Sequence, residues 1–299
     1  MLLNIEPPNN RVSNAPPTNN KNWNSLTFAN VQLAFSLLTL LTAWIIVLLV
    51  DILEALSLED FLASSSAVYP LIWYHLLKEG SPIEFLQWLT LGICLCIAGY
   101  STWISKRIGK AALASCFFLF TAGLLLMLAE DSLNVRHLTA NAYLLPTTEV
   151  FVDPSIARTI WEVFFFSLLS ILMISPLGML YMCRTTRAEI PSRLIAGYAI
   201  YGMIGFGSAL RSLSDWQERL GNWLIGAFDL AEKKAWSMAL ARSERALKEN
   251  PDFTFTTGYL LFDHLIEESI ELIAASLLLS GFIVLFFRIR RRLRLSTPS

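Results

Sequence analysis

Acidic residues and a histidine follow one face of the last apolar helix that the sequence predicts. Four of them recur at i, i+3, i+4 and i+7, the spacing that places side chains on one side of a helix: His264, Glu267, Glu268 and Glu271. Carboxylates and imidazole can transfer protons, form ion pairs or bind cations. An apolar run and then an arginine block follow within 272–294. One helix would therefore carry a candidate site at one end and a membrane anchor at the other.

A second polar set lies at the outer end of an earlier apolar stretch. Glu130, Asn134 and His137 have the same helical spacing. Asp131 and Arg136 lie beside them. Other apolar stretches place polar residues at the same depth: Asp51, Glu84, Gln87, Glu162 and Arg211. These groups are expected to share one layer near the outer boundary of the hydrocarbon.

Several carboxylates in one such layer cannot all stay ionised without partners, because burial and like charge both disfavour the charged form. Three outcomes are physical: ion pairing, protonation of some acids, or a bound divalent cation. The candidate ion-pair partners are Glu84, Asp131, Arg136, Glu162, Arg211 and Glu267. The candidate metal ligands are Glu130, His137, Glu268 and Glu271. Neither stripe matches a dedicated metal motif, and the ordinary reading of the layer is structural.

These residues must be positioned by helices that lie in a membrane. Of the 299 residues, 55% are hydrophobic and only 16% are charged, whereas soluble chains are about one-quarter charged. A membrane-spanning helix needs about 20 apolar residues, and six stretches suffice: 26–50, 85–104, 111–129, 160–182, 194–210 and 271–287. We therefore predict an all-α polytopic membrane protein with about six transmembrane helices and a helical outer, periplasmic cap. The net charge of −1 gives no reason to expect nucleic acid as a partner.

The distribution of lysine and arginine predicts the orientation. The two tails and the loops after the second and fourth spans hold 13 Lys and Arg against 2 acidic residues. The loops after the first and third spans hold 3 Lys and Arg against 11 acidic residues. Because lysine and arginine are retained on the cytoplasmic side, we expect both termini in the cytoplasm of a bacterium and the protein in its inner membrane.

The chain divides into four predicted parts. Residues 1–25 are rich in Asn and Pro and are expected to form a disordered cytoplasmic tail. Residues 26–210 hold the first five spans with short loops, and within them 53–79 is expected to lie at the membrane interface. Residues 211–258 are expected to form an outer amphipathic helix, since apolar residues recur at helical spacing within 214–249. Residues 259–294 are the last span with its basic cytoplasmic end.

All 23 Lys and Arg and all 24 Asp and Glu lie in the tails, the loops and the ends of the spans. The middle of each span is therefore uncharged. Because pumps and ion-coupled transporters place ionisable groups near the middle of the membrane, this distribution argues against such transport. It leaves a transporter of an uncharged solute as one alternative.

Short motifs at three outer positions carry a resemblance. They are 78–84 before the second span, Glu130-Asp131 with Asn134, Arg136 and His137, and Glu267-Glu268 with Glu271 and Leu272. With these motifs the chain resembles a family of uncharacterised bacterial six-span membrane proteins, a resemblance that implies no activity. It also resembles ceramidase-like membrane hydrolases in its outer acids and histidines, but it lacks their three intramembrane histidines.

Three functions are compatible with these features. The first is a structural or partner-binding membrane protein that contacts the lipid bilayer and a protein partner through the outer amphipathic helix. The second is a metal-dependent hydrolase that acts on a lipid or envelope substrate with the four candidate ligands. The third is the transporter of an uncharged solute. No cofactor other than a divalent metal is expected.

Overall fold

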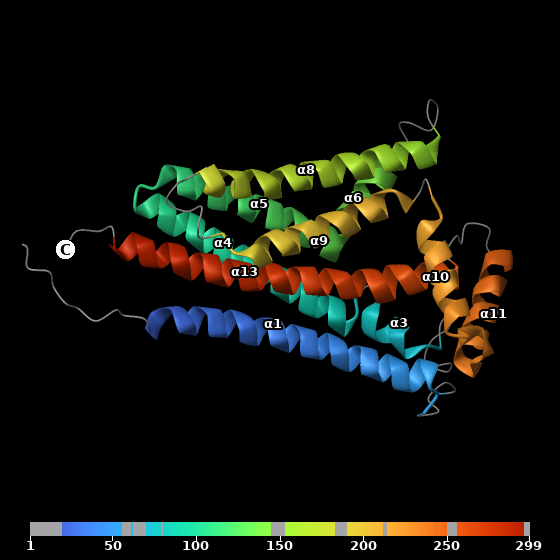
Figure 1. Cartoon of the computed structure of the whole chain (residues 1–299). Coiled ribbons are helices and arrows are strands. Elements are labelled where there is room, and N and C mark those ends of the chain that lie inside the picture. The colour runs from blue at the N-terminus through green and yellow to red at the C-terminus, as the bar shows by residue number, and fades with distance from the viewer. Residues whose placement is uncertain are drawn as a thin grey trace, which may run out of the picture.

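The computed structural model describes residues 20–55, 61, 70–78, 80–144, 153–182, 190–211, 214–249 and 256–295. Within these ranges the chain is all-helical and contains no strand, so the predicted fold class is confirmed at that level. Long helices run along the axis of one bundle (Figure 1): α1 (Asn20–Val47), α4 (Pro82–Arg107), α5 (Ala111–Leu133), α8 (Pro154–Met182), α9 (Ser192–Ala209) and α13 (Glu268–Leu295). The predicted tail up to residue 19 and most of the predicted interfacial segment lie outside the described residues.

Short helical elements connect the long helices. Most of them gather at one end of the bundle, which we call the cap end (Figure 1). They are η1 (Leu48–Ile52), α3 (Ile72–Leu77), α6 (Val135–Thr139), η2 (Ala140–Leu144), α10 (Trp216–Ala227), η5 (Leu230–Glu232), α11 (Lys234–Glu249), α12 (Thr257–Leu260) and η6 (Leu261–Glu267). The first residues of α1 and the last residues of α13 lie at the opposite end (Figure 1).

Helix α13 is the central element of the bundle, because it packs against α1, α4 and α9. Leu278 and Phe282 on this helix are fully buried. Small residues bring α9 close to it: a Cβ atom added to Gly281 would lie 2.8 Å from the backbone nitrogen of Leu194. Such contacts are the usual way in which helices approach closely in lipid, where van der Waals packing replaces the hydrophobic effect.

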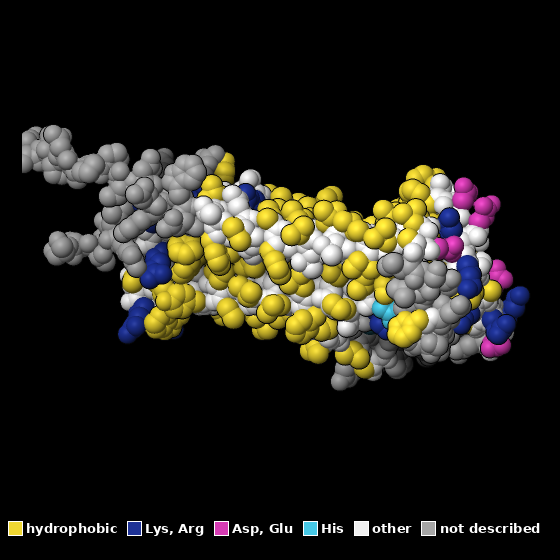
Figure 2. Space-filling view, turned by 90° about the horizontal axis from the view of Figure 1, so that it is seen from below, with side chains coloured by type: hydrophobic (Ala, Val, Ile, Leu, Met, Phe, Trp, Pro, Cys, Tyr) yellow, Lys and Arg dark blue, Asp and Glu magenta, His cyan; other side chains and the backbone are white. Residues whose placement is uncertain are grey.

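Five of the described helical segments are long and apolar enough to cross a membrane: Ser25–Ile52, Ile72–Arg107, Ala111–Leu133, Ile156–Met182 and Thr257–Arg291. The sixth predicted span corresponds to α9, which has 18 residues and therefore a length of about 27 Å. It lies along the bundle with the others (Figure 1). Apolar side chains cover the middle of the molecule, and Asp and Glu are seen at the cap end (Figure 2). The count of six spans and the cytoplasmic position of the termini stay predictions.

The single outer helix predicted over 214–249 is instead two helices. Helix α10 ends at Ala227, and Asp229 adopts a left-handed conformation with φ 49° before η5 and α11. A left-handed residue cannot continue a right-handed helix, and aspartate tolerates this conformation better than most residues. The chain turns at this point, so α10 and α11 both lie at the cap end of the bundle and do not form one long rod (Figure 1).

The turn at Asp229 brings α11 onto η1, at the cap end of α1. The indole Nε1 of Trp236 donates to the backbone oxygen of Asp51 at 2.9 Å. Its ring stacks on Trp73, with ring centroids 6.2 Å apart. Trp73 lies in the segment 53–79 that is predicted to lie at the membrane interface, but its side chain is fully buried on α3 against Trp236 of α11. This tryptophan therefore belongs to the core of the cap.

Candidate functional site

The polar layer begins where α5 ends. Asn134 terminates α5 in a left-handed conformation with φ 51° and ψ 43°, and α6 starts at the next residue. Asparagine is one of the few residues other than glycine that adopt this conformation readily. The helix predicted to carry Glu130 and His137 on one continuous face is therefore broken between them. The reversal directs the chain back over the last turn of α5.

Because of this reversal, Arg136 meets Glu130 at short range. The backbone N–H of Arg136 donates to Oε2 of Glu130 at 2.8 Å, and its Nε lies 2.9 Å from Oε1. Both residues are buried. The guanidinium also lies 3.8 Å from a carboxylate oxygen of Glu162 and over the ring of Phe166. Both oxygens of Glu130 are thus engaged by one arginine.

His137 lies between two arginines and a glutamate. Its Nε2 is 3.2 Å from Nη2 of Arg136 and 2.7 Å from Nη2 of Arg211. A guanidinium can only donate hydrogen bonds, so this Nε2 must accept, and the proton of the neutral ring must lie on Nδ1. Nδ1 is 3.7 Å from Oε1 of Glu162. The pKa of His137 is lowered from 6.5 to about 3, first by burial and then by the nearby guanidinium groups of Arg136, Arg211 and Arg158.

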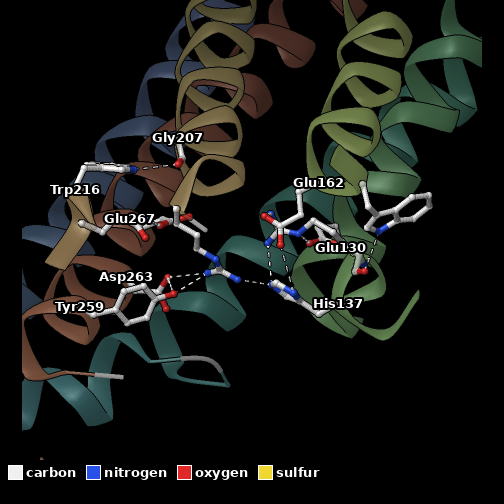
Figure 3. Close-up of polar contacts among 12 residues, drawn as sticks. Glu130, His137, Glu162, Gly207, Trp216, Tyr259, Asp263 and Glu267 are labelled. Carbon is white, nitrogen blue, oxygen red and sulfur yellow. Dashed lines mark hydrogen bonds and ion pairs between the residues drawn. The ribbon is translucent and has the colours of Figure 1, made fainter. Parts of the chain in front are cut away.

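Arg211 carries these contacts across to the last helical segment (Figure 3). Its Nη1 donates to the hydroxyl of Tyr259 at 2.7 Å and lies 3.5 Å from Oδ1 of Asp263. The same hydroxyl donates to Asp263 at 3.1 Å. We call this set the arginine network: Glu130, Arg136, His137, Glu162, Arg211, Tyr259 and Asp263. It joins α5, α6 and α8 to α12 and η6.

A second set of contacts surrounds the amide of Gln87 on α4. Its Nε2 lies 2.9 Å from Asp131, 2.9 Å from Glu271 and 3.2 Å from the hydroxyl of Tyr201. Tyr201 also donates to Asp131. Gln87 is fully buried. We call this set the glutamine network, and it joins α4, α5, α9 and α13.

Two further acids of the first stripe lie next to these networks. Glu267 accepts a hydrogen bond from Nε2 of Gln217 on α10 at 3.0 Å. Glu268 is 8% exposed, and within the described part of the chain its Oε2 has no hydrogen-bond partner. The carboxyl groups of Glu271, Glu84 and Asp131 are close enough to interact with it electrostatically. Glu267 therefore contacts α10 in the cap, whereas Glu268 lies near other acids.

The structure divides the four predicted metal ligands between two sets of contacts. Glu130 and His137 belong to the arginine network, and Glu271 belongs to the glutamine network beside Glu268. Among the described residues, no three His, Cys, Asp or Glu side chains are grouped as a metal ion would require. The predicted ion-pair partners Arg136, Glu162 and Arg211 come together, and Asp131 joins the glutamine network instead.

Two members of the networks, Tyr201 and Tyr259, are missing from the set predicted by sequence, and so is Gln217, which donates to Glu267. All three are polar groups on otherwise apolar or amphipathic helices, and tyrosine at this depth is normally assigned to the headgroup region. The spacing of Tyr259 and Asp263, i and i+4, was the available signal that their side chains meet. For Tyr201 and Gln217 the partners lie on other helices, so no local spacing could indicate them.

Comparison of the chain with protein-family models, with curated proteins and with solved structures finds no match.

Proposed function

We propose that this chain is an integral membrane protein with a structural and partner-binding function, in which the arginine network attaches an outer cap to the transmembrane helices. Arg211 is the observation that carries the proposal. It follows α9, and its guanidinium contacts His137 on α6 and both Tyr259 and Asp263 on the segment that leads into α13. One partly buried cation therefore joins elements from distant parts of the chain.

The donor and acceptor pattern supports this function better than metal-dependent hydrolysis. A histidine ligates a metal through an unprotonated ring nitrogen, and Nε2 of His137 already accepts from Arg136 and Arg211. A metal ion there would replace two guanidinium groups. Glu130 would in turn have to release Arg136, which contacts both of its oxygens. A metal-dependent hydrolase would therefore require these contacts to be broken before the metal could bind.

The cap offers a surface for a partner. Charged side chains of both signs gather on this end of the molecule (Figure 2). On α11, Glu244 and Arg245 are exposed, whereas Ala239 on the opposite face is fully buried. Mixed charge around an exposed helix face is suited to recognition by electrostatic complementarity. The partner is therefore expected to contact the outer face of α11.

Hydrogen–deuterium exchange in nanodiscs tests the attachment of the cap. In Arg211→Met we expect faster exchange at 257–267 and in α10, because the link from Asp263 to His137 is lost. Arg219→Met is the matched control, since Arg219 is exposed on α10 and its guanidinium donates to Ser214 on the same surface at 3.4 Å. Equal exchange in both variants would refute the proposed role of Arg211.

Metal analysis separates the two functional classes. Detergent-purified protein is expected to hold less than stoichiometric Zn, Mn or Fe, and its melting temperature is expected to be unchanged by a chelator. A stoichiometric metal that disappears in both Glu130→Gln and Glu271→Gln would favour the hydrolase.

A photo-crosslinking residue at Glu244 tests partner binding in native membranes, with Ala239 as the buried control position. Adducts at both positions, or at neither, would argue against the cap as the partner surface.

A further inference from the structure

A long apolar groove lies on the lateral face of the bundle. It runs along α4 from Phe85 to Tyr100 and has a volume of about 750 Å³. The fifteen steps from Phe85 to Tyr100 correspond to about 22 Å along the helix axis. Residues of α5 complete it towards the cap, and Phe286 and Arg290 of α13 complete it at the other end. The groove is thus about as long as one half of a bilayer or slightly longer.

The floor of the groove is open at Gly92. A Cβ atom added there would meet no atom within 4 Å. Phe85 and Tyr100 at the two ends are 63% and 48% exposed. Because glycine has no side chain, Gly92 leaves a narrow depression between the larger side chains on this face of α4. The shape and the apolar lining fit an extended hydrocarbon chain.

The groove ends at a positive charge. Arg290 borders it, with its guanidinium 5.9 Å from the ring centroid of Phe286. Arg290 and Phe286 also border a small cavity between α4, α5 and α13, with a volume of about 20 Å³. Ser105 lines this cavity, is fully buried, and its hydroxyl has no hydrogen-bond partner in the described part of the chain. The cavity has room for one water molecule, which would link this hydroxyl to an anion held by Arg290.

We propose that the groove binds an anionic phospholipid, with one acyl chain along the Gly92 face of α4 and the phosphate at Arg290. Lys106 and Arg107 at the end of α4 are exposed and add positive charge at the same end of the bundle. Basic pockets between transmembrane helices are recognised sites for anionic headgroups. The site is independent of the polar layer and of the function proposed for it.

Charge also distinguishes a lipid from a second copy of the chain. A symmetric dimer formed through parallel α4 faces would place the groove of one copy against the same groove of the other. Arg290, Arg107 and Lys106 of the two copies would then face each other, and like charges in an interface are unfavourable. A phosphate at the same position is attracted by all three.

Lipid binding to the purified protein tests the proposal. Native mass spectrometry after delipidation would compare added phosphatidylglycerol with phosphatidylcholine. For the unmodified chain we expect phosphatidylglycerol to bind about fivefold more tightly, which corresponds to about 1 kcal/mol for one arginine near the membrane surface. Arg290→Gln should remove this preference, while Arg219→Gln at the cap end should leave it unchanged. Equal binding of the two lipids by the unmodified chain would refute the phosphate site.

A second pair of variants tests the acyl-chain site. Gly92→Leu fills the floor of the groove, where its Cβ atom would meet no atom within 4 Å, and we expect it to weaken the binding of both lipids. Gly202→Leu is the matched control, because a Cβ atom added to Gly202 on α9 also meets no atom within 4 Å. Equal melting temperatures of the two variants without added lipid would show that both fold. Unchanged lipid binding in Gly92→Leu, or a loss of dimers in that variant alone, would overturn the proposal, the second result in favour of a protein interface.

Discussion

Glu130 is contacted twice by the same arginine, through the backbone N–H of Arg136 at 2.8 Å and through its Nε at 2.9 Å. The two residues are six positions apart, and the contact exists because Asn134 reverses the chain between them. A buried carboxylate is thereby neutralised from within its own segment. The same guanidinium remains available to Glu162 and His137, so the pair is the starting point of the arginine network.

Removing one partner of this pair should destabilise the protein strongly. Glu130→Gln or Arg136→Met alone is expected to lower the free energy of unfolding by about 3 kcal/mol, because each leaves the other charge buried without its partner. The double variant should lose less than the sum of the two. Melting temperatures in detergent, arranged as a double-mutant cycle, measure this coupling. Simple additivity of the two losses would contradict a paired contact.

The neutral state of His137 predicts a dependence of stability on pH. Its pKa is lowered from 6.5 to about 3 by burial and then by neighbouring guanidinium groups. Between these values the unfolded chain binds a proton that the folded chain does not, so stability falls as the pH falls below about 6.5. At pH 5 the loss amounts to about 2 kcal/mol. His137→Gln keeps an acceptor for Arg211 but cannot be protonated in this range. This variant should therefore lack the loss of stability that His137 causes at pH 5.

The measurement is the difference in melting temperature between pH 7 and pH 5, taken for the unmodified chain and for His137→Gln. The acidic residues are the same in both proteins, so any inequality between the two melting-temperature differences reports on His137. Equal differences would mean that the imidazole is protonated in the folded protein, and the acceptor role of its Nε2 would have to be abandoned.

Glu268 should respond in the opposite direction from Glu130. Its Oε2 has no hydrogen-bond partner in the described part of the chain, and it lies among the acids Glu271, Glu84 and Asp131. Glu268→Gln replaces a carboxyl group that lies among acids by a neutral amide, whose N–H₂ can donate to a neighbouring carboxylate. We expect the melting temperature at pH 7 to be unchanged or raised, by up to about 1 kcal/mol in free energy. A loss as large as that of Glu130→Gln would show that the charge of Glu268 is needed.

The attachment of α10 to α12 depends on two glycines in direct contact. A Cβ atom added to Gly221 would lie 1.8 Å from the backbone oxygen of Gly258. Gly221→Ala must therefore separate the two backbones, and we expect a loss of at least about 2 kcal/mol together with faster hydrogen exchange in α10. Gly226→Ala on the same helix has open space and should be neutral or slightly stabilising. Equal behaviour of the two variants would mean that α10 is not held at this contact.

The long helices could be predicted from sequence because each is an apolar run of the length that lipid requires, ending in charge. The depth of the polar layer could also be predicted from these apolar runs, because the acids lie at their ends. The pairing of residues within the layer could not be predicted. It depends on Asn134 and Asp229, whose left-handed conformations break two helices that the spacing alone makes continuous. Both residues can adopt helical and left-handed conformations, so only the surrounding packing decides between them.

The burial of Trp73 could not be predicted from the sequence either. Trp73 has the flanking residues of an interfacial anchor, and its burial depends on Trp236, which lies on a different helix far along the chain. The partners of Tyr201 likewise come from α4 and α5. Composition and periodicity report on the environment of one helix at a time. They carry no information on which two helices meet once the bundle has formed.

Asp51 imposes an order on the biogenesis of this protein. Its carboxylate accepts the N–H groups of Ile72 and Trp73 at 2.8 and 2.9 Å, and its backbone oxygen accepts Trp236, which lies 185 positions further along. Because a chain is synthesised from its N-terminus, the backbone oxygen of Asp51 is in place long before its indole donor. Closure of the cap against α1 is accordingly a late step in folding. Variants at Trp236 should accumulate with their long helices formed and a protease-sensitive cap.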